Sequence, residues 1–150
     1  MNWGVEPPRA KSLAGTRVLV ADDEAVIALE LEYLLDRAGA KVVGPAFNVE
    51  EALELAADPD LSAAVLDVRL GRESVGPVAR ALAVAGVPFL FFSGQTESDD
   101  VRREWPGRAF IQKPAPSEAL LEAVRRLVAP AGPQRDEQNP REAPAADSLK

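Results

Sequence analysis

The sequence contains no cysteine and no histidine, and each absence excludes several kinds of chemistry. Without cysteine, the chain has no disulfide framework, no thiolate nucleophile and no cysteine-ligated metal. Without histidine, it has no Ser-His-Asp hydrolytic triad, no histidine-ligated zinc and no phosphohistidine of its own. Any acid–base or metal chemistry must therefore use carboxylates, hydroxyls and ammonium groups.

Charge and hydropathy narrow the class of partner. The chain has 24 acidic against 17 basic residues, a net charge of −7, which argues against nucleic acid as a partner. It also lacks an apolar run of about 18 residues and the apolar core of a signal peptide. We therefore expect a soluble, cytoplasmic protein that binds neither nucleic acid nor membrane.

The composition predicts one domain with two polar ends. A length of 150 residues with 47% hydrophobic residues suits one ordinary domain. Residues 1–15 are predicted to be a flexible N-terminal arm. Residues 130–150 contain four prolines and one large aliphatic side chain, so they are predicted to be a disordered tail. The folded domain is then expected at 16–129.

Short apolar runs alternate with amphipathic stretches through this domain. The runs predicted as strands are 17–21, 41–44, 63–67, 87–92 and 109–112. The helices are predicted at 25–38, from Asn48 to Pro59, from Val75 to Gly86, weakly at 96–105, and from Ser117 onward, with Asn48 and Ser117 as N-caps and Gly39 and Gly86 at the C-terminal ends. This alternation predicts a doubly wound α/β fold with a parallel sheet, and a fourth helix that is short or irregular.

Polar residues follow four of the five predicted strands. Asp22 and Asp23 follow the first strand, Asp67 the third, Ser93 the fourth and Lys113 the fifth. In a parallel sheet these ends meet at one edge, where ligands bind. Three carboxylates at one point repel each other unless a cation joins them, and Mg²⁺ prefers such oxygen ligands. With Ser93 and Lys113 available to an anion, the pattern indicates phosphoryl transfer.

Each of these residues also has a simpler interpretation when it is taken alone. An acidic pair at a helix start interacts favourably with the helix dipole. Ser93-Gly94 is typical of a turn, and Lys113-Pro114 of a strand end. Their occurrence at successive strand ends favours a shared site.

Four segments together carry a resemblance to a known family. They are Val-Leu-Val-Ala-Asp-Asp-Glu at 18–24, Ala-Val-Leu-Asp-Val-Arg-Leu at 64–70, Phe-Phe-Ser-Gly at 91–94 and Gln-Lys-Pro at 112–114. Over residues 16–128 the sequence resembles the receiver domain of two-component response regulators. The resemblance implies a flavodoxin-like receiver fold with five parallel strands in the order 2-1-3-4-5.

The resemblance also implies roles for the residues at the strand ends. Asp67 would be the phosphoacceptor, forming an aspartyl phosphate. Asp22, Asp23 and Asp67, with the backbone carbonyl of Arg69, would hold Mg²⁺. The other two strand-end residues would bind the phosphoryl group: Ser93 through a hydrogen bond and Lys113 through its charge.

Further roles follow from the same resemblance. Lys113-Pro114 is expected to be a cis peptide. Phe110 occupies the place of an aromatic side chain that changes rotamer when the serine moves, although an ordinary core role fits it equally. Arg69 and Gln95 flank the route of the hydrolytic water, so we expect them to tune the phosphate's lifetime; solvated loop side chains are the alternative.

The sequence departs from the family pattern in two places. Gly71 stands where receivers commonly have a proline. Residues 88–95 are similar to the Pro-Phe-x-Phe-x-Thr-Gly-Tyr stretch of a stand-alone alphaproteobacterial subset, with Ser93 for the threonine and Gln95 for the tyrosine. Likeness to that subset implies a partner kinase of the HWE or a related class.

The expected function is that of a single-domain response regulator. A histidine kinase or phosphotransfer protein would phosphorylate Asp67 in a Mg²⁺-dependent reaction, and output would be contact with a downstream protein not identified by the sequence. No separate substrate would be turned over, so we do not expect an enzyme in the ordinary sense.

Three other functions compete with this one. A pseudo-receiver interaction module would keep the fold without phosphotransfer. A phosphatase resembling the haloacid dehalogenase type needs a second aspartate where Arg69 stands. A nucleotide- or flavin-binding protein would bind in the same crevice, but the chain has neither glycine-rich phosphate-binding motif.

Overall fold

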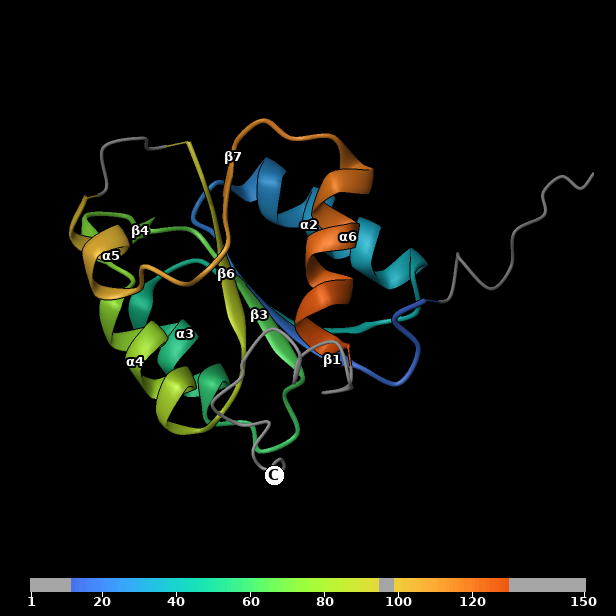
Figure 1. Ribbon diagram of the computed structural model, residues 1–150, viewed down its shortest axis with the longest axis horizontal. Coiled ribbons are helices and arrows are strands. Elements are labelled where there is room, and N and C mark those ends of the chain that lie inside the picture. The colour runs from blue at the N-terminus through green and yellow to red at the C-terminus, as the bar shows by residue number, and fades with distance from the viewer. Residues whose placement is uncertain (1–11, 95–98, 130–150) are drawn as a thin grey trace, which may run out of the picture.

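The computed structural model describes residues 12–94 and 99–129, apart from the side chains of residues 99, 100 and 102. Its main sheet has five parallel strands in the order β2-β1-β3-β6-β7 (Figure 1). The strands are β1 (Arg17–Ala21), β2 (Lys41–Ala46), β3 (Ala63–Leu66), β6 (Phe89–Ser93) and β7 (Phe110–Gln112). Numbered within this sheet alone, the order is 2-1-3-4-5, which confirms the expected topology.

Helices cover both faces of the sheet (Figure 1). One layer consists of α2 (Ala25–Arg37) and α6 (Ser117–Val128), and the other of α3 (Val49–Ala56), α4 (Gly76–Val84) and α5 (Asp99–Glu104). Every residue of β3 and β6 is buried because neither face meets water. The doubly wound α/β prediction is confirmed, and α5, the fourth helix that follows a strand of the main sheet, is short.

Alternation along the strands divides the core into two layers. In β6, Phe89 and Phe91 pack toward α3, α4 and α5, whereas Leu90 and Phe92 pack toward α2 and α6. Phe92 therefore lies on the α2 and α6 side, one residue before Ser93.

The strand ends predicted from the sequence lie within two residues of the observed ones, whereas one of the two predicted N-caps is wrong. The side chain of Asn48 accepts a hydrogen bond from Glu51 N–H at 2.8 Å, as an N-cap does. Gly39 follows α2 with a φ of +100°, a conformation that glycine adopts without strain. The prediction that Ser117 is the N-cap of the last helix was wrong. The Pro116 carbonyl accepts the first helical hydrogen bonds, so Ser117 is already inside α6.

Two local structures were not predicted. A short antiparallel hairpin, β4 (Arg69–Leu70) and β5 (Glu73–Ser74), follows the third main strand. Residues 12–15, assigned from the sequence to the flexible arm, form a turn in which Leu13 is fully buried and its N–H donates to Ala38 O at 2.8 Å. Packing thus begins before residue 16, whereas 1–11 and 130–150 lie outside the described residues.

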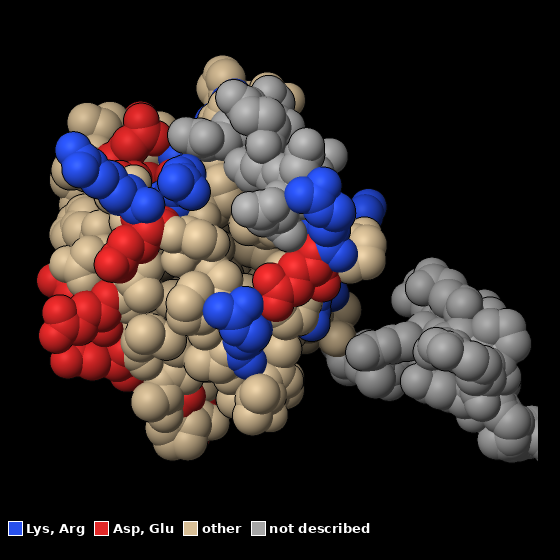
Figure 2. Space-filling model, turned by 90° about the vertical axis from the view of Figure 1, so that its left-hand side faces the viewer, with Lys and Arg blue, Asp and Glu red and all other residues tan. Residues whose placement is uncertain are grey.

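The described surface mixes charges of both signs. On the face that Figure 2 shows, Lys and Arg side chains lie beside Asp and Glu side chains. In the layer formed by α3, α4 and α5, the Arg80 side chain of α4 forms an ion pair with Glu104 of α5 at 3.0 Å. Within the described ranges, none of the helices is long and apolar enough to cross a membrane.

Candidate functional site

Three of the polar residues predicted at the strand ends, Asp22, Asp67 and Lys113, meet at the carboxyl edge of the sheet. Backbone hydrogen bonds hold them there: Asp67 N–H donates to Ala21 O at 2.9 Å, and Lys113 N–H donates to Ser93 O at 2.9 Å. From β1 the chain goes first to β2 on one side and then to β3 on the other. The site lies at this reversal, where doubly wound sheets bind ligands.

The Lys113 ammonium group lies at the centre of the site. Its Nζ is 2.8 Å from Asp22 Oδ2, 3.1 Å from Asp67 Oδ2 and 2.8 Å from Glu24 Oε1. The side chains of Asp22, Asp67 and Lys113 are nearly buried, whereas the Glu24 side chain is 62% exposed. One positive charge therefore faces three carboxylates in a largely dry environment.

Glu24 is the residue of this cluster that sequence reasoning missed. It is the N-cap residue of α2, and its N–H donates to Asp22 Oδ1 at 2.9 Å. This bond turns the chain after the two aspartates and brings the third acid to Lys113. The run Asp-Asp-Glu at 22–24 was the available signal.

Burial and charge shift two pKa values in the site. Burial raises the pKa of Asp22 from 3.8 to about 6, although Lys113 and the Glu24 N–H lower it in part. Burial alone would lower the pKa of Lys113, but its interactions with Asp22, Glu24 and Asp67 outweigh burial and raise it. Lys113 is therefore a permanent positive charge near neutral pH.

The oxygen atoms of the cluster suit a hard divalent cation. One carboxylate oxygen each of Asp22, Glu24 and Asp67 lie within 4.8 Å of one another. Asp22 Oδ2 is buried, and the Lys113 ammonium that lies 2.8 Å from it is shared with two further carboxylates. Excess negative charge and three carboxylate oxygens close together fit Mg²⁺.

Asp23, the second predicted acid, lies outside this cluster. Its Oδ2 accepts a hydrogen bond from the Gly71 N–H at 2.8 Å. Arg69 lies in the same hairpin as Gly71, two residues after Asp67, and its side chain is exposed, with Nη2 3.4 Å from the carbonyl oxygen of Arg72. The structure thus brings Asp23 to the hairpin rather than to Lys113.

The remaining predicted residues lie along β6 and β7. Ser93 is fully buried at the end of β6. The Phe110 ring is half-buried, with its centroid 6.3 Å from that of Phe91. Lys113-Pro114 is a cis peptide, as expected, and so is Gly44-Pro45. Gln95 lies outside the described residues.

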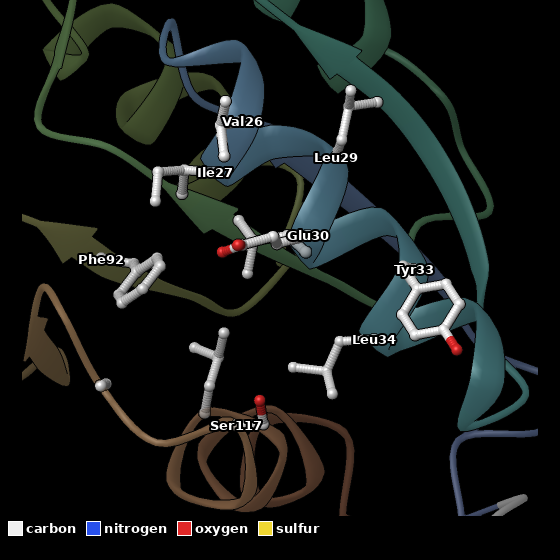
Figure 3. A pocket seen from close by; sticks show the side chains of 11 residues that line it. Val26, Ile27, Leu29, Glu30, Tyr33, Leu34, Phe92 and Ser117 are labelled. Carbon is white, nitrogen blue, oxygen red and sulfur yellow. The ribbon is translucent and has the colours of Figure 1, made fainter.

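An apolar groove with a volume of about 610 Å³ adjoins the site. It runs between α2 and α6, and Phe92 forms part of its wall (Figure 3). The same Phe92 ring lies 5.5 Å from Lys113 Nζ, so one side chain borders both groove and site. Along α2, Val26, Leu29 and Tyr33 are more than half exposed.

No protein-family model matches the chain, but solved structures and curated proteins are similar to it. SdrG from Sphingomonas melonis Fr1 is 35% identical, covering 79% of this chain and 98% of that one with a TM-score of 0.67. A response regulator receiver protein from Sinorhizobium medicae WSM419 is 26% identical, covering 75% and 94% with a TM-score of 0.68.

A curated protein is also similar in sequence. The transcriptional regulatory protein PdtaR from Mycobacterium tuberculosis is 32% identical over 117 residues, 75% of this chain. The match covers 56% of PdtaR, so this chain corresponds to about half of that protein.

The raised pKa of Asp22 predicts a pH-dependent effect of Asp22→Asn on the metal-free protein. Because the pKa is higher in the folded than in the unfolded chain, folding takes up a proton between about pH 4 and pH 6. The stability that Asp22 contributes is thus complete below its usual pKa and is lost as pH rises through about 6. Relative to wild type, Asp22→Asn should gain stability over this range, by at most about 3 kcal/mol.

Urea denaturation in EDTA between pH 4 and pH 7 measures this difference. Glu54→Gln, which removes an exposed carboxylate on α3, is the control: it measures how the loss of one negative charge far from the site changes the free energy of unfolding. A relative stability of Asp22→Asn that stays constant or falls with rising pH would contradict the prediction.

Proposed function

Because the chain belongs to the response regulator receiver family, we propose that it accepts a phosphoryl group on Asp67 from a histidine kinase or phosphotransfer protein, in a Mg²⁺-dependent reaction. The observation that carries this proposal is the contact between Lys113 Nζ and Asp67 Oδ2 at 3.1 Å, at the carboxyl edge of the sheet. We further propose a histidine kinase of the HWE or a related class as the phosphodonor, on the basis only of the sequence resemblance to the stand-alone subset.

The chemistry follows from the surroundings of Asp67. One of its oxygens attacks phosphorus while the bond from phosphorus to the donor nitrogen breaks, and the electron pair of that bond stays with the donor. The Lys113 ammonium compensates the charge that arrives with the phosphoryl group. Asp22, Asp23, Asp67 and the Arg69 carbonyl would hold Mg²⁺, which when bound supplies further positive charge to the phosphoryl oxygens.

The hairpin geometry supports the Arg69 carbonyl as a ligand. Val75 N–H donates to Val68 O at 2.9 Å, which makes Val68 and Val75 a hydrogen-bonded pair. Because bonded and non-bonded pairs alternate in an antiparallel ladder, Arg69 and Ser74 form a non-bonded pair. The hairpin therefore does not use the Arg69 carbonyl, which lies two residues after the phosphoacceptor.

Signalling would follow as a shift between two conformations. Ser93 and Lys113 would move toward the phosphoryl group, and Phe110 would follow the serine. Phe110 already borders a small pocket with Phe91 and Trp105, so the core beside it has room to repack. Phosphorylation would thereby change the surface near β6 and β7, where a downstream protein would bind.

The groove between α2 and α6 is the proposed docking surface for the phosphodonor. The donor histidine must reach Asp67, and this groove adjoins the site through Phe92. Val26, Leu29 and Tyr33 recur along α2 at the spacing of one helix face, which suits packing against a helix of a histidine-bearing protein. Figure 3 shows these side chains around the groove.

Incubation with acetyl phosphate and Mg²⁺ should add one phosphoryl group to the wild-type chain. Asp67→Asn should abolish the added mass because it removes the nucleophile, and EDTA should abolish it by removing the metal. Glu54→Gln should be phosphorylated like wild type. Intact-mass spectrometry measures all four samples; wild type without added mass would instead favour the pseudo-receiver alternative.

Arg69 and Gln95 remain proposed to tune the lifetime of the aspartyl phosphate. Replacing both with alanine should change the dephosphorylation rate at least threefold, since both flank the expected route of the attacking water. Loss of phosphoprotein after removal of acetyl phosphate gives the rate. An unchanged rate would leave both as solvated loop side chains.

Substitutions in the groove should separate protein donors from small-molecule donors. Leu29→Glu and Tyr33→Glu should slow transfer at least tenfold from any histidine kinase or phosphotransfer protein that labels the wild-type chain. Labelling by acetyl phosphate should be unchanged, because Asp67 is intact. Val84→Glu, on the exposed face of α4, is the matched control. Equal loss with both donors would contradict a docking role.

A further inference from the structure

The second acid of the site has a partner that the site chemistry does not use. Asp23 Oδ2 accepts a hydrogen bond from the Gly71 N–H at 2.8 Å, a contact between residues 48 positions apart. This contact holds the Asp23 carboxylate outside the group formed by Asp22, Glu24 and Asp67. Asp23 is exposed, so its side chain has room to turn.

Gly71 is suited to make this contact. Together with Arg72 it forms the two-residue turn of the hairpin, with a φ of +65°, a conformation that glycine adopts readily. A proline at this position would have no N–H to donate. The glycine that departs from the family pattern is therefore the residue that supplies the bond to Asp23.

The hairpin is a firm support for this bond. Val68, Leu70 and Val75 are buried in the core beneath α3 and α4, and Val75 N–H donates to Val68 O. The hairpin also begins two residues after Asp67. Between the two partners, the exposed Asp23 side chain is the one that can move without disturbing the core.

We propose that the Gly71 N–H is a positioning group that holds Asp23 away from the cluster in the metal-free protein, and that Asp23 leaves it on joining Mg²⁺. This inference rests on the metal site of the proposed function. A charged acceptor makes a stronger hydrogen bond than a neutral one, so the Gly71 N–H competes with the metal for Asp23. Metal occupancy is thereby linked to the hairpin beside the phosphoacceptor.

Hydrogen exchange of the Gly71 amide, followed by NMR on the full chain, tests the inference directly. Saturating Mg²⁺ should speed exchange about tenfold, as expected for loss of one hydrogen bond to a charged group. Asp23→Ala should speed it similarly without metal, and Mg²⁺ should then add nothing. The Gly76 amide, which donates to Ser74 Oγ at 3.0 Å in the same segment, should not respond.

A second experiment compares Gly71→Pro with Gly71→Ala. A Cβ at this position meets no atom within 4 Å, but the φ of +65° strains alanine and is closed to proline. Gly71→Pro therefore both removes the N–H and changes the turn, whereas Gly71→Ala keeps the N–H. By isothermal titration, Gly71→Pro should bind Mg²⁺ several-fold more tightly than Gly71→Ala. Should Gly71→Pro fail to fold, the exchange experiment alone decides.

The outcomes separate this inference from the proposed function. If Mg²⁺ shifts the amide signals of Asp22 and Asp67 but leaves Gly71 exchange unchanged, the positioning role is wrong and the metal site stands. Equal Mg²⁺ affinities of two folded Gly71 variants would also overturn it. If Mg²⁺ shifts none of these signals, the metal step of the proposed function fails together with this inference.

Discussion

The interaction on which the site depends is the contact of one ammonium group with three carboxylates. Lys113 joins the ends of β1, β3 and β7 electrostatically, because Asp22 and Asp67 follow two of those strands and Lys113 the third. Two buried acids this close would otherwise repel each other strongly. Yet one cation cannot neutralise three anions, so the site keeps a surplus of negative charge that favours a second cation.

Burial of the sheet determines the surroundings of the Asp67 carboxylate. β3 is buried at all four residues because helices cover both faces, and Asp67 comes directly after it. A carboxylate that follows such a strand lies between dry core and open edge. Asp67 is 7% exposed, so the charge of Lys113 is screened less there than it would be in bulk water.

The sequence predicted these strand ends because each apolar run stops at a polar residue, and a parallel sheet brings such ends together. The strand order came from the resemblance and not from the residues themselves. Glu24 was missed because its position depends on a local turn made by Asp22, and Leu13 because a single aliphatic residue carries no periodicity. The hairpin was missed because two-residue strands are too short for alternation to reveal.

Asp22 and Asp23 are adjacent in sequence and identical in chemistry, but burial separates their behaviour. Asp22 is 1% exposed and fixed between the Glu24 N–H and Lys113, so it cannot change partners without opening the core. Asp23 is exposed and bound only to a hairpin amide in the described structure, so a change of partner requires one side-chain rotation. Under the proposed function, the fixed acid would retain a site for the cation, and the movable neighbour would allow the protein to respond when the cation binds.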